Sequence, residues 1–148
     1  MKLLIAAHRA DETEFYERYN QELGYSIDFW EKPLTLENVD RVRGCEAVAI
    51  NAGCAVDLAM AQALQERGVR FLLTRTAGYD HLDASALEEA GIAAAYVPAY
   101  SPNAISEHTV LLLLSLLRKM KLQQHRIDAQ YFFIEGLRGR QLTNMTVG

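Results

Sequence analysis

Cysteines, basic tracts and long apolar runs are all scarce in this sequence. Cys45 and Cys54 are the only cysteines among 148 residues, too few for the disulfide framework typical of small secreted domains. The apolar start, residues 1–5, is shorter than a signal peptide, and a leucine-rich run at residues 110–114 falls far below the ~18 residues of a membrane span. We therefore expect a cytoplasmic chain with free thiols and no membrane partner.

The charge balance shows no basic excess. Lys and Arg number 15 against 19 Asp and Glu, which gives a formal net charge of −4 at pH 7. A protein that tracks a phosphate backbone carries a clustered basic surface, so nucleic acid is not an expected partner. Apolar residues make up 50% and charged residues 23% of the chain, as in ordinary globular domains.

Short β-rich runs alternate with helical patterns over the first hundred residues. Such alternation is typical of right-handed βαβ units and a parallel sheet. Because no Rossmann fingerprint is present, residues 1–100 are predicted as an α/β, flavodoxin-like, doubly wound five-stranded sheet of order 2-1-3-4-5. The expected strands are residues 3–6, 26–30, 47–50, 71–74 and 93–97, the expected helices are residues 12–23, 36–42, 56–66 and 84–90, and the expected helix-ending glycines are Gly24, Gly44, Gly68 and Gly91.

A long helix is expected after the last strand. Ser101 suits its N-cap and Pro102 its first turn, and the apolar pattern continues to about Met120. Leucines on every side of its centre indicate cover on more than one face. Two interpretations remain open, a central core helix or a helix between two domains or subunits. Residues 101–148 are thus predicted as a long crossover helix and a tail.

The loop after the fourth expected strand carries the most informative chemistry. Ala77 and Gly78 are small, so their backbone N–H groups are accessible to a ligand beyond the carboxyl end of a strand. Hydrogen bonds from such groups to a charged acceptor contribute ~1.5–3 kcal/mol each, enough for two to hold a small carboxylate. A plain turn is the alternative.

Other polar residues have simpler explanations. Asp80, His81 and Asp83 resemble an acid-base or metal cluster, but we interpret them as turn residues, with Asp83 as a helix N-cap. Neighbouring Glu107 and His108 point in different directions on a helix and cannot share a proton. Tyr100 differs from these residues because it lies at a loop tip over the crevice, where a phenol can close a pocket.

Two segments together resemble a known family. Arg75-Thr-Ala-Gly-Tyr-Asp-His-Leu-Asp83 and Val97-Pro-Ala-Tyr-Ser-Pro-Asn-Ala-Ile-Ser-Glu-His-Thr-Val110 are similar, in order and spacing, to the substrate-domain signatures of NAD-dependent D-2-hydroxyacid dehydrogenases. The Tyr-Ser-Pro-Asn form resembles the D-lactate dehydrogenase branch. The resemblance implies that Ala77 and Gly78 bind the carboxylate of a small 2-oxo or 2-hydroxy acid, and that Tyr100 orients the 2-oxo group.

The resemblance also implies what this chain does not contain. The family's catalytic arginine, glutamate and histidine lie in later sequence, and its G-x-G-x-x-G loop follows a strand that begins at about Thr146. No G-x-G-x-x-G occurs in the 148 residues. NAD is therefore expected in the full-length parent, none is expected bound to this chain, and no catalytic residue is assigned here.

Two functional hypotheses follow. The first is the substrate-binding part of an oxidoreductase, inactive alone; the second is a non-catalytic flavodoxin-like binding or assembly module. A phosphoacceptor receiver domain would need aspartate where Asn51 stands and lysine where Pro98 stands. The family packs the long helix against a cofactor domain and a second subunit, which predicts a homodimer through the helix from Ile105 to Met120.

Overall fold

The chain forms two compact units, Met1–Tyr100 and Ser101–Gly148. The computed structural model describes residues 1–143 and 145–147. The first unit contains the sheet and the second contains two helices. Among the described residues, no helix combines the length and the apolar character that crossing a membrane requires.

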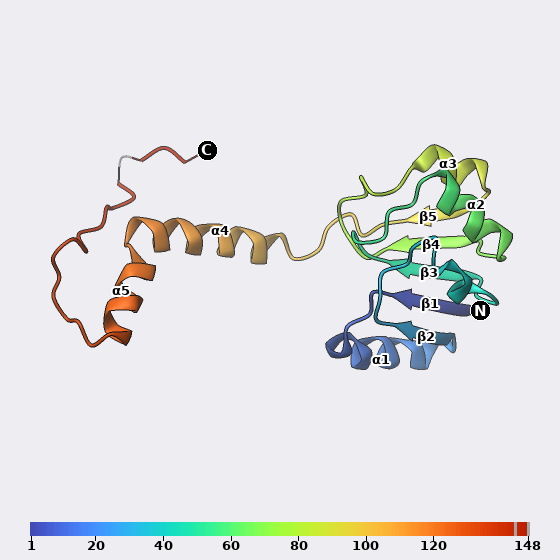
Figure 1. Cartoon of the computed structure of the whole chain (residues 1–148), viewed down its shortest axis with the longest axis horizontal. Coiled ribbons are helices and arrows are strands. Elements are labelled where there is room, and N and C mark those ends of the chain that lie inside the picture. Colours follow the sequence, from blue (N-terminus) through green and yellow to red (C-terminus); the bar gives the residue numbers. More distant parts are fainter. Residues whose placement is uncertain (144, 148) are drawn as a thin grey trace. The chain divides into compact units, whose positions relative to one another are not determined.

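The first unit is built on a five-stranded parallel sheet in the order β2-β1-β3-β4-β5 (Figure 1). The predicted α/β fold and its 2-1-3-4-5 order are thereby confirmed. Central β3 is buried along its whole length, as expected of a parallel strand with cover on both faces. The strands are β1 (Lys2–Ala6), β2 (Ser26–Trp30), β3 (Ala47–Ile50), β4 (Phe71–Thr74) and β5 (Ala93–Ala95).

Alternation along the strands divides the core between the two faces of the sheet. Leu4, Val48 and Leu72 are paired neighbours on one face, and they join a buried cluster that includes Leu64 and Leu87 from two helices. On the other face, Tyr16 of a third helix packs against Phe29 of β2, with ring centroids 5.9 Å apart. The sheet is therefore doubly wound.

The helices of this unit begin and end at residues with clear local causes. Helix α1 (Thr13–Leu23) follows the short 3-10 helix η1 (Ala10–Glu12) and stops at Gly24, which has φ +63° and donates its N–H to the Asn20 carbonyl. Asp57 caps α2 (Leu58–Glu66) through the Met60 N–H, and Asp83 caps α3 (Ala84–Glu89) through the Ala86 N–H. The N-cap role predicted for Asp83 is confirmed. All four glycines expected at helix ends have positive φ.

Five expected elements of the first unit are shorter than the sequence suggested. The helices expected at residues 12–23, 56–66 and 84–90 lose one or two residues at an end, and the other two are the helix expected at residues 36–42 and the last strand. Only η2 (Val39–Val42), a 3-10 helix, forms within the predicted helix at residues 36–42. Asn38 prevents an earlier start, because its side chain closes a turn by bonding the Thr35 N–H and the Pro33 carbonyl. The last strand ends at Ala95 instead of residue 97, where Val97 donates to the Thr76 carbonyl of a loop.

The second unit corrects the prediction of one helix reaching Met120. Helix α4 (Pro102–Leu117) ends at Arg118, and Lys119 adopts φ +55° before α5 (Met120–Asp128) begins. Ser101 occupies the N-cap position as expected, but it has φ +42° and its side chain makes no capping hydrogen bond. The strand expected to begin near Thr146 is not formed by Met145, Thr146 or Val147, and Gly148 lies outside the described residues.

Candidate functional site

Backbone hydrogen bonds join the loops after β1 and β4 to the ends of neighbouring strands at the carboxyl edge of the sheet. After β1, the Ala7 N–H donates to the carbonyl of Lys32, in the loop after β2, and the His8 N–H donates to the carbonyl of Trp30, the last residue of β2. After β4, the Arg75 N–H donates to the Ile50 carbonyl at 2.8 Å. Ligands of open parallel sheets bind at this edge, so the site is built from these loops.

Arg75 anchors the turn after β4 to the loop after β1. Its guanidinium donates to the Glu12 carboxylate at 2.6 Å and to the carbonyls of Ala6 and Ala7 at 3.0 and 2.9 Å. The side chain of Arg75 is only 15% exposed. The charge of Arg75 is therefore already paired within the fold.

Two carbonyl groups of the turn have fixed partners. The Thr76 carbonyl accepts from the Val97 N–H at 3.2 Å, and the Gly78 carbonyl accepts from the Thr76 hydroxyl at 2.6 Å. In a trans peptide the C=O and the next N–H point in opposite directions. The Ala77 N–H therefore points away from Val97, and the Tyr79 N–H points away from the Thr76 hydroxyl.

The N–H groups of this turn are available to a ligand. Among the described residues, no protein acceptor bonds the N–H of Thr76, Ala77 or Gly78. Ala77 and Gly78 are both exposed, and a Cβ placed on Gly78 would meet no atom within 4 Å. Consecutive free N–H groups at the end of a strand can bind a carboxylate or phosphate.

Tyr100 lies in the loop after β5, whose start adjoins this turn. Its side chain is 59% exposed, and among the described residues it forms no hydrogen bond or aromatic contact. The structure thus brings the two loops together through Thr76 and Val97, but it does not bring the Tyr100 phenol onto the Ala77 and Gly78 amides.

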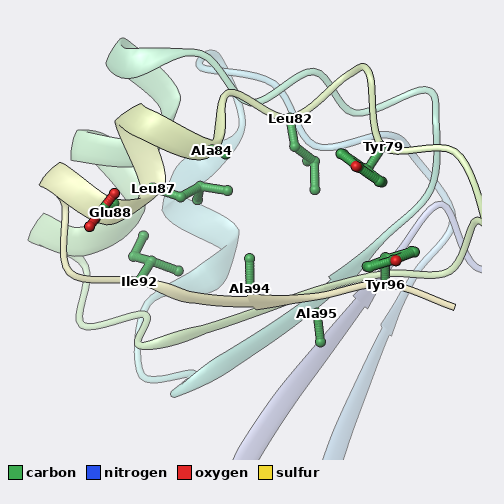
Figure 2. Close-up of a pocket in the computed structure, with 9 residues that line it drawn as sticks. All are labelled: Tyr79, Leu82, Ala84, Leu87, Glu88, Ile92, Ala94, Ala95 and Tyr96. Atoms are coloured by element: carbon green, nitrogen blue, oxygen red, sulfur yellow. The ribbon is translucent and has the colours of Figure 1, made fainter. Parts of the chain in front are cut away.

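An apolar cavity of about 320 Å³ lies beside the turn, between α3 and β5. Figure 2 shows Leu82, Leu87 and Ile92 along its wall and the tyrosines Tyr79 and Tyr96 together at one end. Their ring centroids are 5.0 Å apart and tilted by 54°. No sequence pattern had indicated this cavity.

Of the remaining polar candidates, Asp80, Glu107 and His108 are exposed on the surface. His81 is bonded to a threonine of β4, which fits neither a metal ligand nor a free base. No group of metal-ligating side chains is found in the described part of the chain. Both cysteines are buried and unpaired, and burial raises the pKa of the Cys45 thiol above its ordinary value of 9.0.

The chain's residues do not fit a dinucleotide. Among the loops after the strands, only those after β3 and β4 contain a glycine, Gly53 and Gly78 respectively, and each contains just one. The Gly53 N–H is already bonded to the Asn51 side chain at 3.0 Å. A pyrophosphate needs a glycine-rich turn that opens a helix, and no such turn occurs in the 148 residues.

Sequence reasoning interpreted His81 as a turn residue but missed the hydrogen bonds by which Thr74, Thr76 and His81 organise the turn. The hydroxyl of Thr74 lies 2.7 Å from that of Thr76 and 2.9 Å from His81 Nε2. The signal was present in part, because residues two apart in an extended segment share a face. The contact to His81 could not be read from spacing, since it depends on how the chain turns after Gly78.

The fold and the turn define a class of protein: an α/β domain in which, among the described residues, backbone N–H groups at the carboxyl edge of a parallel sheet have no protein acceptor. The chain belongs to the family "D-isomer specific 2-hydroxyacid dehydrogenase, catalytic domain", which it matches over residues 3–146. This match confirms the resemblance found in the sequence.

Individual relatives agree with this membership. The chain is 33% identical over 148 residues to an aromatic 2-oxoacid reductase of Clostridium sporogenes, covering all of this chain and 45% of that protein. It is similar to the apo-structure of D-lactate dehydrogenase from Escherichia coli, with TM-score 0.85, 28% identity and coverage of 96% of this chain and 46% of that one. A D-isomer specific 2-hydroxyacid dehydrogenase from Lactobacillus delbrueckii ssp. bulgaricus in its NAD complexed form gives TM-score 0.73, 25% identity and coverage of 97% and 44%. The chain therefore spans about half the length of the relatives that it matches.

Proposed function

We propose that the chain is the substrate-binding part of an NAD-dependent D-2-hydroxyacid dehydrogenase of the lactate type. The reaction reduces a 2-oxo acid to a D-2-hydroxy acid, with hydride transfer to C2 and a proton to the carbonyl oxygen. In this reaction the chain would bind the acid. The hydride donor and the proton donor would come from sequence outside these 148 residues. Family membership and the named D-lactate dehydrogenase relatives support the proposal.

The observation that carries the proposal is the pair of free N–H groups on Ala77 and Gly78. A carboxylate bound there would accept two charge-assisted hydrogen bonds, worth ~1.5–3 kcal/mol each. Tyr100, at the neighbouring loop tip, would orient the 2-oxo group from its exposed position. Fixed carbonyls at Thr76 and Gly78 support this role because they hold the turn in one conformation.

NAD belongs, in this proposal, to a domain outside these 148 residues, since no glycine-rich phosphate loop is present among them. The chain would therefore bind the acid without the cofactor. We place the protein in the cytoplasm, in agreement with two buried, unpaired thiols.

Titration of the isotopically labelled chain with pyruvate tests the site. We expect the amide resonances of Ala77 and Gly78 to shift together, and acetate, which lacks the 2-oxo group, to bind more weakly. Gly78→Pro deletes one donor, whereas Gly78→Ala keeps the N–H and fits without a clash. The proline variant should bind about tenfold more weakly than the alanine variant. Equal affinity of the two variants, or shifts confined to other loops, would contradict the proposed site.

A further inference from the structure

A chain of hydrogen bonds runs from His81 to the Gly78 carbonyl. His81 Nε2 lies 2.9 Å from the Thr74 hydroxyl, that hydroxyl lies 2.7 Å from the Thr76 hydroxyl, and Thr76 donates to the Gly78 carbonyl at 2.6 Å. Thr74 is fully buried. This chain of hydrogen bonds begins at His81, passes through buried Thr74 of β4, and ends in the turn that contains Ala77 and Gly78.

The direction of every bond in this chain follows from its last acceptor. A carbonyl can only accept, so the one hydroxyl proton of Thr76 is committed to Gly78. Thr76 must then accept from Thr74, which commits the single proton of Thr74 as well. The Thr74 oxygen is left as an acceptor, and His81 must donate from Nε2. The Gly78 carbonyl thus sets the tautomer of a ring three hydrogen bonds away.

The histidine end of this chain is anchored and the glycine end is not. The His81 carbonyl accepts from the Val56 N–H at 2.8 Å, and Val56 pairs with Leu82 as a parallel bridge. Two residues later, Asp83 caps α3. At the other end, Gly78 is exposed. The anchored His81 therefore holds Thr74 and Thr76 in place, and Thr76 in turn holds the Gly78 carbonyl.

We propose that His81, Thr74 and Thr76 are positioning residues for the anion-binding turn, with His81 acting as an obligatory Nε2–H donor that orients the Gly78 peptide. None of the three is assigned a contact with the substrate. The inference rests on the proposed function for its consequence, acid binding, but its geometry can be measured without any ligand.

The ligand-free arm of the test uses the labelled 148-residue chain. Nuclear magnetic resonance of the imidazole nitrogens should find the proton of neutral His81 on Nε2, protected from exchange with water. His81→Gln keeps an N–H donor at nearly the same reach and should preserve the amide shifts of Gly78 and Tyr79. An ionised glutamate can only accept and methionine offers no donor, so His81→Glu and His81→Met should both move the amide resonances of Gly78 and Tyr79 away from their wild-type positions. His125→Gln and His125→Glu, on α5, are the matched controls and should leave these two amides unchanged.

The binding arm uses pyruvate as the probe. Thr76→Val should weaken pyruvate binding about five- to tenfold, and Thr76→Ser should restore it. Thr109→Val is the matched control because Thr109 also donates its hydroxyl to a backbone carbonyl, that of Ile105 in α4.

Each outcome separates the two proposals. A neutral His81 whose only ring proton is on Nδ1 overturns the positioning role whether or not pyruvate binds. Gly78 and Tyr79 amide shifts that are preserved in His81→Glu as well as in His81→Gln overturn it too. Equal pyruvate affinity of Thr76→Val and Thr109→Val also overturns it. If wild-type protein binds no pyruvate while the ring and Gly78 measurements match expectation, the proposed function fails and the hydrogen-bond chain stands.

Discussion

Arg75 donates to the carboxylate of Glu12 at 2.6 Å, although 63 residues separate the two in sequence. The pair joins the turn after β4 to the start of α1. The same guanidinium also bonds the carbonyls of Ala6 and Ala7. One side chain therefore donates to three acceptors on two different segments of the chain.

Replacing this arginine should be costly. Arg75→Ala leaves two carbonyls and the Glu12 charge without their donor, and we expect the free energy of unfolding to fall by ~3 kcal/mol. Chemical denaturation followed by circular dichroism measures the change. Arg9→Ala removes an exposed pair with Asp11 and should leave stability unchanged. Similar losses in the two variants would show that Arg75 contributes no more than a surface ion pair.

Cys45 should make the fold sensitive to alkaline pH. Burial raises the pKa of its thiol above 9.0 in the folded state, so the folded state holds this proton more tightly than the unfolded state. The resulting contribution is complete below pH 9.0 and is lost as pH rises through the folded-state pKa. Between pH 8 and 10.5, wild type should lose stability more steeply than Cys45→Ala. Parallel curves for the two proteins would refute this expectation.

Asp40 should titrate at unusually low pH. The hydrogen bond from Arg67, at 2.7 Å, is the main reason that the pKa of Asp40 lies below 3.8, and the charge of Arg43 adds to it. Stability from this contact is present above pH 3.8 and is lost as pH falls through the lowered pKa. Carbon resonances of the carboxyl group should report the titration. Arg67→Gln should raise the pKa of Asp40 more than Arg43→Gln does. The reverse order would show that Arg43, and not Arg67, is the main cause of the low pKa.

The fold was predictable from sequence to a greater extent than the site was. Strand positions follow from local alternation and from glycines such as Gly24, whose left-handed conformation ends α1. The strand order was inferred from the absence of a Rossmann fingerprint in a doubly wound sheet. The break between α4 and α5 was missed because Arg118 and Lys119 are ordinary helix formers, and neither glycine nor proline marks the position. The Thr74–His81 contact was missed because it depends on the bridge between Val56 and Leu82, which no local pattern encodes. The roles of Ala77, Gly78 and Tyr100 stay predictions.

A homodimer remains our expectation, although the segment proposed to form it is not one helix. Met120 belongs to α5, and α4 ends at Leu117. Leu111, Leu112 and Leu116 are 57%, 51% and 78% exposed, and exposed apolar surface of several hundred Å² is uncommon in stable monomers. Light scattering should give the mass of two chains. Leu112→Glu should favour the single chain, while Leu58→Glu on α2 should not. A one-chain mass at micromolar concentration, with stability independent of dilution, would rule the dimer out.

The chain alone should not oxidise NADH with pyruvate. It offers no dinucleotide loop, and none of its residues is assigned as hydride or proton donor. Absorbance at the NADH band should stay constant over hours at high protein concentration. Turnover above a blank that persists after repurification would mean that this chain itself binds NADH and supplies a proton donor.

The contiguity of the sheet has a consequence for how the protein is made. All five strands lie between Lys2 and Ala95, and no strand is contributed by the second unit among the described residues. Since domains generally fold as units during synthesis, the sheet can close on the ribosome while α4 is still in the exit tunnel. Both thiols would then be enclosed early in translation, before the exposed leucines of α4 emerge.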